Sequence, residues 1–269
     1  MNDTVFVLAF SMCNMMAFSA QASFWTSAAG APLHWLDTFA SSAACMALYI
    51  FDRMIPSSGD DPESAFRKRA RNGPALVTLV TASAFVVVSG LFHRHLLRNT
   101  MIALPFGLVY CAQSTPIKTL FPCSKNVYVS LMWLCWFFGA ADAFPPPDSA
   151  HSNVYVAYFC HMMLSNAIMD VKDVRGDREN GIRTLPVMVG ERMARPALLT
   201  CTVALAFAGA RIDTALPITY AAFAMVLAIV KLDDGFHASL CSLALMVMPW
   251  CVSKLLNAVV YDQMTQLWW

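Results

Sequence analysis

Apolar residues along this chain are grouped into nine long runs, which short polar segments separate. A helix needs about 17–25 residues to cross a bilayer, and each run has this length. The runs lie at residues 4–25, 31–52, 74–92, 99–117, 127–144, 152–171, 195–212, 214–231 and 235–258. The pattern therefore predicts an all-α integral membrane protein with nine transmembrane helices in one domain, residues 1–269. The first run has no basic segment before it and no small-residue cleavage site, so we expect a retained helix.

The composition supports a membrane protein and argues against several other classes. Hydrophobic residues make up 58% of the chain and charged residues only 13%, whereas charged residues are roughly a quarter of a soluble protein. The net charge of +1 and the lack of a basic aromatic face give no support to nucleic-acid binding. The nine cysteines are scattered without a Cys-x-x-Cys pair, which argues against a disulfide framework or a zinc site.

The distribution of basic residues predicts the orientation of the helices. Fourteen of the eighteen Lys and Arg fall in the segments after the second, fourth, sixth and eighth runs. Because basic loops remain in the cytosol, these loops are expected on the cytosolic side. They hold Arg53, Arg67, Lys68, Arg69, Arg71, Lys118, Lys125, Lys172, Arg175, Arg178, Arg183, Arg192, Arg195 and Lys231.

Two of these loops are also acidic, and they lie four helices apart. The second run continues into "YIFDRMIPSSGDDPESAFRKRARNG" and the sixth into "MDVKDVRGDRENGIRTLP". The leading aspartates, Asp52 and Asp170, occupy corresponding helix ends on the same side of the membrane. This predicts two parallel repeats, with acidic loops at about 52–73 and 170–195 and a site at the interface between the repeats.

Carboxylates in the second loop are spaced for metal binding. Asp170, Asp173 and Asp177 would form one stripe if the sixth helix continued through them, and Asn166 falls on the same stripe. Three carboxylates so close repel one another unless a cation lies between them. Mg²⁺ suits such a site because it binds oxygen ligands and often bridges carboxylates to substrate phosphates.

Basic residues surround these carboxylates and extend the interpretation to a substrate. A diphosphate ester reacts by releasing diphosphate, whose oxygens carry negative charge. A metal ion held by carboxylates, together with basic side chains, would stabilise that charge. A solvated loop with surface ion pairs is the simpler interpretation, but the matching acidic loop four helices earlier favours a site. The basic residues are Lys172, Arg175, Arg178 and Arg183, with the cluster at 67–71.

The stretch "DVKDVRGDRENGIRTLPVMVG" resembles the second aspartate-rich motif of the UbiA superfamily of intramembrane prenyltransferases. The resemblance implies nine helices around a central cavity, with Mg²⁺ and an isoprenyl diphosphate held at its cytosolic mouth. Asp170, Asp173 and Asp177 would be metal ligands, and Asp52 would open the first motif. Lys118 or Lys125 would lie near the diphosphate. Further candidates for substrate binding are Arg53, Asn166, Lys172, Arg178 and Arg183.

The first motif departs from the family pattern Asn-Asp-x-x-Asp-x-x-x-Asp. Phe51 replaces the asparagine, Ile55 the second aspartate and Gly59 the third. Asp60 and Asp61 follow one or two residues late. Either the loop is shifted, so that Asp60 or Asp61 supplies a metal ligand, or one metal ion has fewer protein ligands.

Two reactions share the ionisation step that the resemblance implies. A transferase lets an acceptor, often aromatic, capture the allylic cation, whereas a terpene cyclase lets the substrate's own double bonds capture it. The degenerate first motif, the short chain and the aromatic segment "LMWLCWFF" narrowly favour cyclisation of farnesyl diphosphate. Its aromatic residues, whose π faces can stabilise a cation, are Trp133, Trp136, Phe137 and Phe138.

Other classes of function have less support. A transporter would need charged residues along a path through the membrane. Asp37 lies fifteen residues before Asp52, roughly 22 Å along a helix. Asp37 is therefore expected near the opposite interface, and no such path is visible. Essential roles for Asp37 and Lys254 would favour a transporter. The aspartate signature of the CDP-alcohol phosphotransferases is absent, and nothing in the sequence indicates an obligate protein partner.

Overall fold

A computed structural model of the chain describes residues 3–30, 34–54, 73–111, 116–140, 149–230, 232 and 235–266. Within these ranges each regular element is a helix, and the nine long ones correspond in order to the nine apolar runs. The predicted all-α fold is confirmed. The long helices are α1 (Asp3–Ala28), α2 (Trp35–Met54), α4 (Gly73–Phe92), α5 (Arg94–Cys111), α6 (Ser124–Ala140), α7 (Ser149–Asp170), α10 (Glu191–Gly209), α11 (Ala215–Ile229) and α12 (Gly235–Gln266).

Helix boundaries differ from the predicted ones mainly at polar ends. α5 begins at Arg94 instead of residue 99, and α6 begins at Ser124 instead of residue 127. A hydropathy pattern places an end where apolar residues stop, whereas a helix continues into the polar residues beside it. Lys125 and Asn126 therefore lie in the first turn of α6, where the helix fixes their positions.

Membrane crossing by all nine helices remains a prediction. By length and composition, two stretches of the described residues qualify as candidate spans, Ser152–Glu179 and His237–Ala258. The first includes charged residues after Asp170, which lie beyond its apolar part. Leu76–Phe92 and Ala215–Ile229 are shorter apolar helices.

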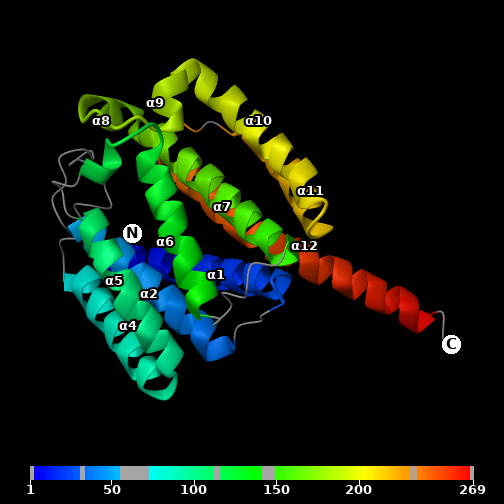
Figure 1. Cartoon of the computed structure of the whole chain (residues 1–269), viewed down its shortest axis with the longest axis horizontal. Coiled ribbons are helices and arrows are strands. Elements are labelled where there is room, and N and C mark those ends of the chain that lie inside the picture. Colours follow the sequence, from blue (N-terminus) through cyan, green and yellow to red (C-terminus); the bar gives the residue numbers. More distant parts are fainter. Residues whose placement is uncertain are drawn as a thin grey trace.

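The long helices form a closed ring of neighbours. Each packs against the next in the order α1, α2, α4, α5, α6, α7, α10, α11 and α12, and α12 packs against α1. In Figure 1 the blue and cyan helices gather on one side and the yellow helices on the other, and the end of α12 projects beyond the bundle. α1 and α12 also contact α7, so the two sides meet around the helix that ends at the second acidic loop.

Buried aromatic residues hold the centre of the bundle together. The rings of Trp25 on α1 and Tyr158 on α7 meet edge to face, with centroids 5.5 Å apart. His161 Nδ1 and the Tyr220 hydroxyl form a hydrogen bond of 2.9 Å between α7 and α11. Facing outward instead, α4 exposes apolar side chains, as expected for a helix in contact with lipid; they are Leu76, Val77, Val80, Phe85, Val87, Val88, Leu91 and Phe92.

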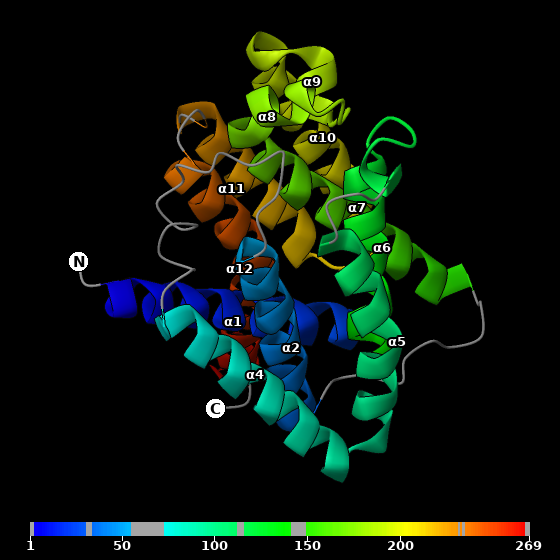
Figure 2. The same ribbon diagram turned by 90° about the vertical axis from the view of Figure 1, so that its left-hand side faces the viewer.

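Short helices follow α7 and shape the second acidic loop. They are the 3₁₀ turn η2 (Val171–Asp173), α8 (Val174–Glu179) and α9 (Leu185–Val189), and α8 and α9 lie together at one end of the molecule (Figure 2). Gly181 has φ +69°, which glycine adopts without strain. The chain turns back there, and the Ile182 amide donates to the Asp177 carbonyl at 2.8 Å.

The segment before α6 is tied directly to this loop. It contains the 3₁₀ turn η1 (Pro116–Lys118). The Cys123 amide donates to the Arg183 carbonyl at 2.7 Å. This bond places the first turn of α6 beside the aspartates that follow α7.

Candidate functional site

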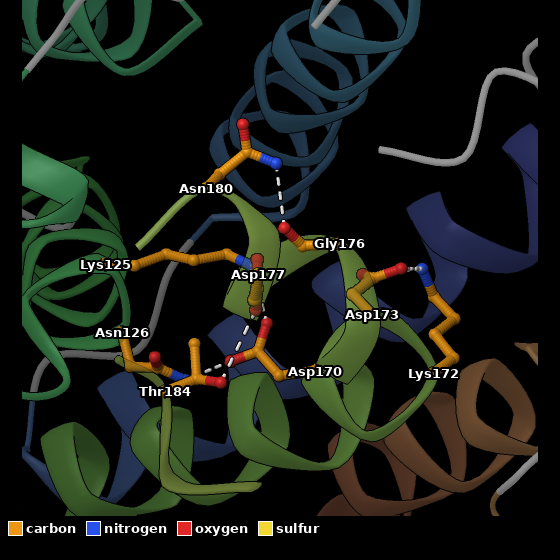
Figure 3. Close-up of polar contacts among 9 residues, drawn as sticks. All are labelled: Lys125, Asn126, Asp170, Lys172, Asp173, Gly176, Asp177, Asn180 and Thr184. Atoms are coloured by element: carbon orange, nitrogen blue, oxygen red, sulfur yellow. Dashed lines mark hydrogen bonds and ion pairs between the residues drawn. The ribbon is translucent and has the colours of Figure 1, made fainter. Parts of the chain in front are cut away.

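Two of the three predicted aspartates meet at one lysine. Lys125 Nζ donates to Asp170 Oδ1 at 2.7 Å and to both carboxylate oxygens of Asp177 at 3.2 Å. Asp170 is the last residue of α7 and 4% exposed, and Asp177 in α8 is 3% exposed. Figure 3 shows the lysine side chain reaching from α6 to the carboxylates. The charge cluster is thus buried and organised.

Two further side chains complete the contacts of these carboxylates. Asn126 Nδ2 donates to Asp170 Oδ2 at 2.7 Å, and the Thr184 hydroxyl donates to Asp177 Oδ2 at 3.4 Å. Neither residue was predicted from the sequence. Asn126 directly follows the candidate Lys125, and Thr184 lies within the Gly-Ile-Arg-Thr-Leu-Pro segment, so both had a signal nearby.

Asp173 does not face the same way as the other two aspartates. Its carboxylate accepts from Lys172 Nζ at 2.8 and 2.9 Å, and Figure 3 shows this pair directed away from Lys125. The expected single stripe required an unbroken α-helix. The structure instead inserts η2 between α7 and α8, and a 3₁₀ turn rotates by about 120° per residue instead of about 100°.

Two other predicted residues border the site from neighbouring elements. Asn166 Nδ2, one turn before Asp170, donates to the Ser130 hydroxyl on α6 at 3.2 Å. Lys118 Nζ lies 4.5 Å from the ring centroid of Tyr110, a cation–π contact. The Tyr110 ring stacks on Tyr128, with centroids 6.0 Å apart. An aromatic pair therefore connects η1, α5 and α6.

The remaining predicted residues are either exposed or outside the described side chains. Arg178 and Arg183 are exposed at the surface of the second loop. Asp52 and Arg53 lie in the last turn of α2, and only their backbone is described. Asp60 and Asp61 lie outside the described residues.

The charges of the cluster influence one another strongly. Burial alone would lower the pKa of Lys125, but the carboxylates of Asp170 and Asp177 raise it well above its ordinary value. Burial raises the pKa of Asp177 to about 6, an effect that the Lys125 ammonium opposes and the Asp170 carboxylate reinforces. Lys125 is therefore a firmly charged cation among carboxylates that compete for positive charge.

These groups suit a hard divalent cation. Asp170 and Asp177 present carboxylate oxygens, and Asn126 Oδ1 is a buried oxygen without a hydrogen-bond partner. Oxygen ligands of this kind are those that Mg²⁺ prefers. Within the described residues no three acidic, histidine or cysteine side chains are already grouped as a metal site. A metal ion between Asp170 and Asp177 would have to take the place of the Lys125 ammonium.

Two charged residues that would bear on a transporter lie far from this cluster. Asp37 in the first turn of α2 is 5% exposed, and its Oδ1 lies 3.0 Å from His93 Nδ1. Lys254 is exposed on α12. The two residues thus belong to separate places in the fold.

Comparison with known proteins gives a consistent result. Residues 67–239, more than half of the chain, match the UbiA prenyltransferase family. No curated protein matches the chain, but four solved structures do. A UbiA homologue from Aeropyrum pernix K1 in its apo form is 18% identical with a TM-score of 0.54, over 89% of this chain and 96% of that one.

A second solved structure agrees with the first. A UbiA homologue from Archaeoglobus fulgidus bound to GPP and Mg²⁺ is 13% identical with a TM-score of 0.51, over 93% of this chain and 99% of that one. At such identities the likeness establishes the fold. With the match over residues 67–239, it leads to one conclusion: this chain belongs to the UbiA prenyltransferase family.

Proposed function

We propose that this membrane-embedded enzyme uses Mg²⁺ to ionise an allylic isoprenyl diphosphate at the cluster around Lys125. The observation that carries the proposal is the contact of one partly buried lysine with two buried aspartates, at 2.7 and 3.2 Å. The substrate class is supported by the Archaeoglobus fulgidus homologue, whose structure contains GPP and Mg²⁺.

Each part of the site has a role in this reaction. Asp170 and Asp177 would hold the metal, joined by Asp173 once its carboxylate turns from Lys172. The metal, when bound, would neutralise charge on the leaving diphosphate. Lys125 would turn from the carboxylates to the diphosphate oxygens, where an ammonium stabilises the negative charge that develops as the carbon–oxygen bond breaks. The electron pair of that bond leaves with the diphosphate, and an allylic cation remains.

Basic residues around the cluster would bind the outer oxygens of the diphosphate. Lys118 ends η1, Lys172 lies beside Asp173 in η2, and Arg178 and Arg183 are exposed on the second loop. Arg53, at the end of α2, is the candidate from the first loop. Exposed side chains can reorient toward a bound anion at little cost.

Transfer of the prenyl group to an acceptor is the principal candidate for the next step, because family membership favours it. Cyclisation of farnesyl diphosphate is the second candidate. It is supported by the altered first motif and by aromatic rings inside the bundle. Trp133 on α6 stacks on Phe18 of α1 with centroids 4.8 Å apart, and Trp136 is 3% exposed.

One assay separates these candidates. Membranes that contain the protein are incubated with farnesyl diphosphate and Mg²⁺ without an acceptor, and the organic extract is analysed by gas chromatography with mass detection. A cyclic hydrocarbon that requires Mg²⁺ would support cyclisation. Intact substrate, followed by prenylation when aromatic acceptors are added, would support transfer. Unreacted farnesyl, geranyl and geranylgeranyl diphosphates with every acceptor tested would contradict the proposal.

The first acidic loop, at about 52–73, is proposed to supply the remaining metal ligands from a repeat parallel to the one that carries Asp170. Asp52 would be one ligand, and either Asp60 or Asp61 another. We expect only one of the variants Asp60→Ala and Asp61→Ala to lower turnover, by about tenfold or more, because a shifted loop places a single carboxylate at the metal. Rates at several Mg²⁺ concentrations measure this. Equal, unchanged activity in both variants would mean that the loop contributes neither residue.

Both acidic loops are proposed to face the cytosol, as the distribution of Lys and Arg predicts. An epitope tag inserted after Glu179 tests the orientation. Antibody binding to membrane vesicles with the cytosolic face outward, and not to vesicles of the opposite orientation, is the expected result; the reverse pattern would contradict the assignment.

A further inference from the structure

Asn126 has a buried side-chain oxygen that makes no hydrogen bond. The residue is 2% exposed, and its Oδ1 has no hydrogen-bond partner. A buried polar atom without a partner costs about 1–3 kcal/mol.

The orientation of the Asn126 amide is fixed by its neighbour. Its nitrogen must face Asp170, because an amide oxygen in that position would meet a carboxylate oxygen and neither could donate. Asn126 Nδ2 indeed donates to Asp170 Oδ2 at 2.7 Å. Oδ1 is bonded to the same carbon as Nδ2 and so lies next to this contact, and rotating the amide would not satisfy Oδ1 without breaking the bond to Asp170.

The Lys125 and Thr184 side-chain donors of the site already have carboxylate acceptors. Lys125 donates to Asp170 and Asp177, and the Thr184 hydroxyl donates to Asp177. A hydrated divalent cation would supply what is missing, because it offers both positive charge and water O–H donors. It would also replace the charge of Lys125 between the two carboxylates.

We infer that Asn126 Oδ1 is one of the oxygens that bind the hydrated metal ion. This ion would enter between Asp170 and Asp177 when the Lys125 ammonium leaves them. This inference rests on the proposed function and adds a residue from α6 to the ligands expected from the acidic loops. α6 thereby contributes two groups to the site. The Lys125 ammonium pairs with the carboxylates when no metal is bound, and Asn126 Oδ1 binds the metal when it is present.

A pair of substitutions separates the oxygen of Asn126 from its nitrogen. Asn126→Asp keeps an oxygen in place of Oδ1 but removes the N–H donor to Asp170. Asn126→Leu has a similar volume and removes both. The readout is the dissociation constant of Mn²⁺, followed by EPR in the presence of inorganic diphosphate. Asn153→Asp and Asn153→Leu are the matched controls, because this asparagine is exposed at the other end of α7.

If Asn126 Oδ1 binds the metal, the two variants should differ in Mn²⁺ affinity. Asn126→Leu should weaken Mn²⁺ binding at least about tenfold, the loss typical of residues that support a metal site, whereas Asn126→Asp should bind Mn²⁺ as tightly as the wild type or more tightly. Equal weakening in both variants would show that only the N–H bond to Asp170 matters, and unchanged binding in both would show that neither group matters. Either result overturns the inference.

The same measurement keeps the proposed function separate. Wild-type protein that binds no Mn²⁺, or an Asp170→Asn variant that binds it normally, would contradict the metal site itself. Loss of binding in Asp170→Asn, together with unchanged binding in both Asn126 variants, would contradict only the inference. If Asn126→Leu does not fold, the Asn126→Asp result decides, because weakened binding there is the outcome that an oxygen donor forbids.

Discussion

Asp170→Asn is expected to lower the rate of diphosphate release by about a thousandfold. The substitution keeps the shape of the side chain but removes a charge that lies 2.7 Å from Lys125 and accepts from Asn126 at 2.7 Å. A neutral amide is a poor ligand for Mg²⁺ and cannot accept both contacts as a carboxylate does. Loss of one preorganised electrostatic group commonly costs 10²–10³ in rate, and loss of a metal ligand adds to this.

Diphosphate released from a prenyl diphosphate at saturating Mg²⁺ measures the effect. Glu179→Gln is the matched control, since Glu179 lies in the same loop, its side chain is 64% exposed, and it pairs with Arg175. Its rate should remain within about twofold of wild type, because an exposed ion pair contributes little. Retention of a tenth or more of the activity by Asp170→Asn would refute the assigned role.

Lys125→Met is expected to have two separable effects. Without metal, the protein should lose about 2–3 kcal/mol of stability, because two nearly buried carboxylates lose their shared cation. With saturating Mg²⁺ this loss should largely disappear, since the metal supplies the missing charge and binds only the folded state. Turnover should still fall about a hundredfold, because no ammonium replaces that of Lys125 at the leaving diphosphate.

Thermal unfolding in detergent with EDTA or Mg²⁺, together with diphosphate release, measures both effects. Lys254→Met is the control for the change of residue type, because Lys254 is exposed on α12, and neither quantity should change. Destabilisation that Mg²⁺ does not reverse would show that Lys125 is a structural residue and that its ammonium does not occupy the metal site.

The sequence predicted the helices well because each apolar run has only one stable way to cross a bilayer. In the absence of water, a segment must satisfy its own backbone hydrogen bonds, and a helix does so locally. Asp170 and Lys125 could be selected for a similar reason, since charges are conspicuous at the ends of apolar runs.

Features that depend on tertiary packing could not be predicted in this way. The separation of Asp173 from Asp177 comes from the 3₁₀ turn η2, which hydropathy does not record. The contact of Asn126 with Asp170 joins residues 44 positions apart and exists because α6 packs on α7. The one signal for Asn126 in the sequence is its place beside Lys125, and that place does not predict a contact with Asp170.

The position of Lys125 has a thermodynamic consequence for how the ligands bind. If metal and ammonium compete for the same two carboxylates, then the cation that Mg²⁺ displaces becomes available to diphosphate, and each ligand prepares the site for the other. Coupling of this kind is reciprocal, so the factor by which Mg²⁺ tightens diphosphate binding equals the factor by which diphosphate tightens Mg²⁺ binding. The affinities for Mg²⁺ and for diphosphate, each measured with and without the other ligand, must then give the same coupling factor. A protein that couples its ligands in this way would hold Mg²⁺ less tightly before a diphosphate arrives than after it has bound.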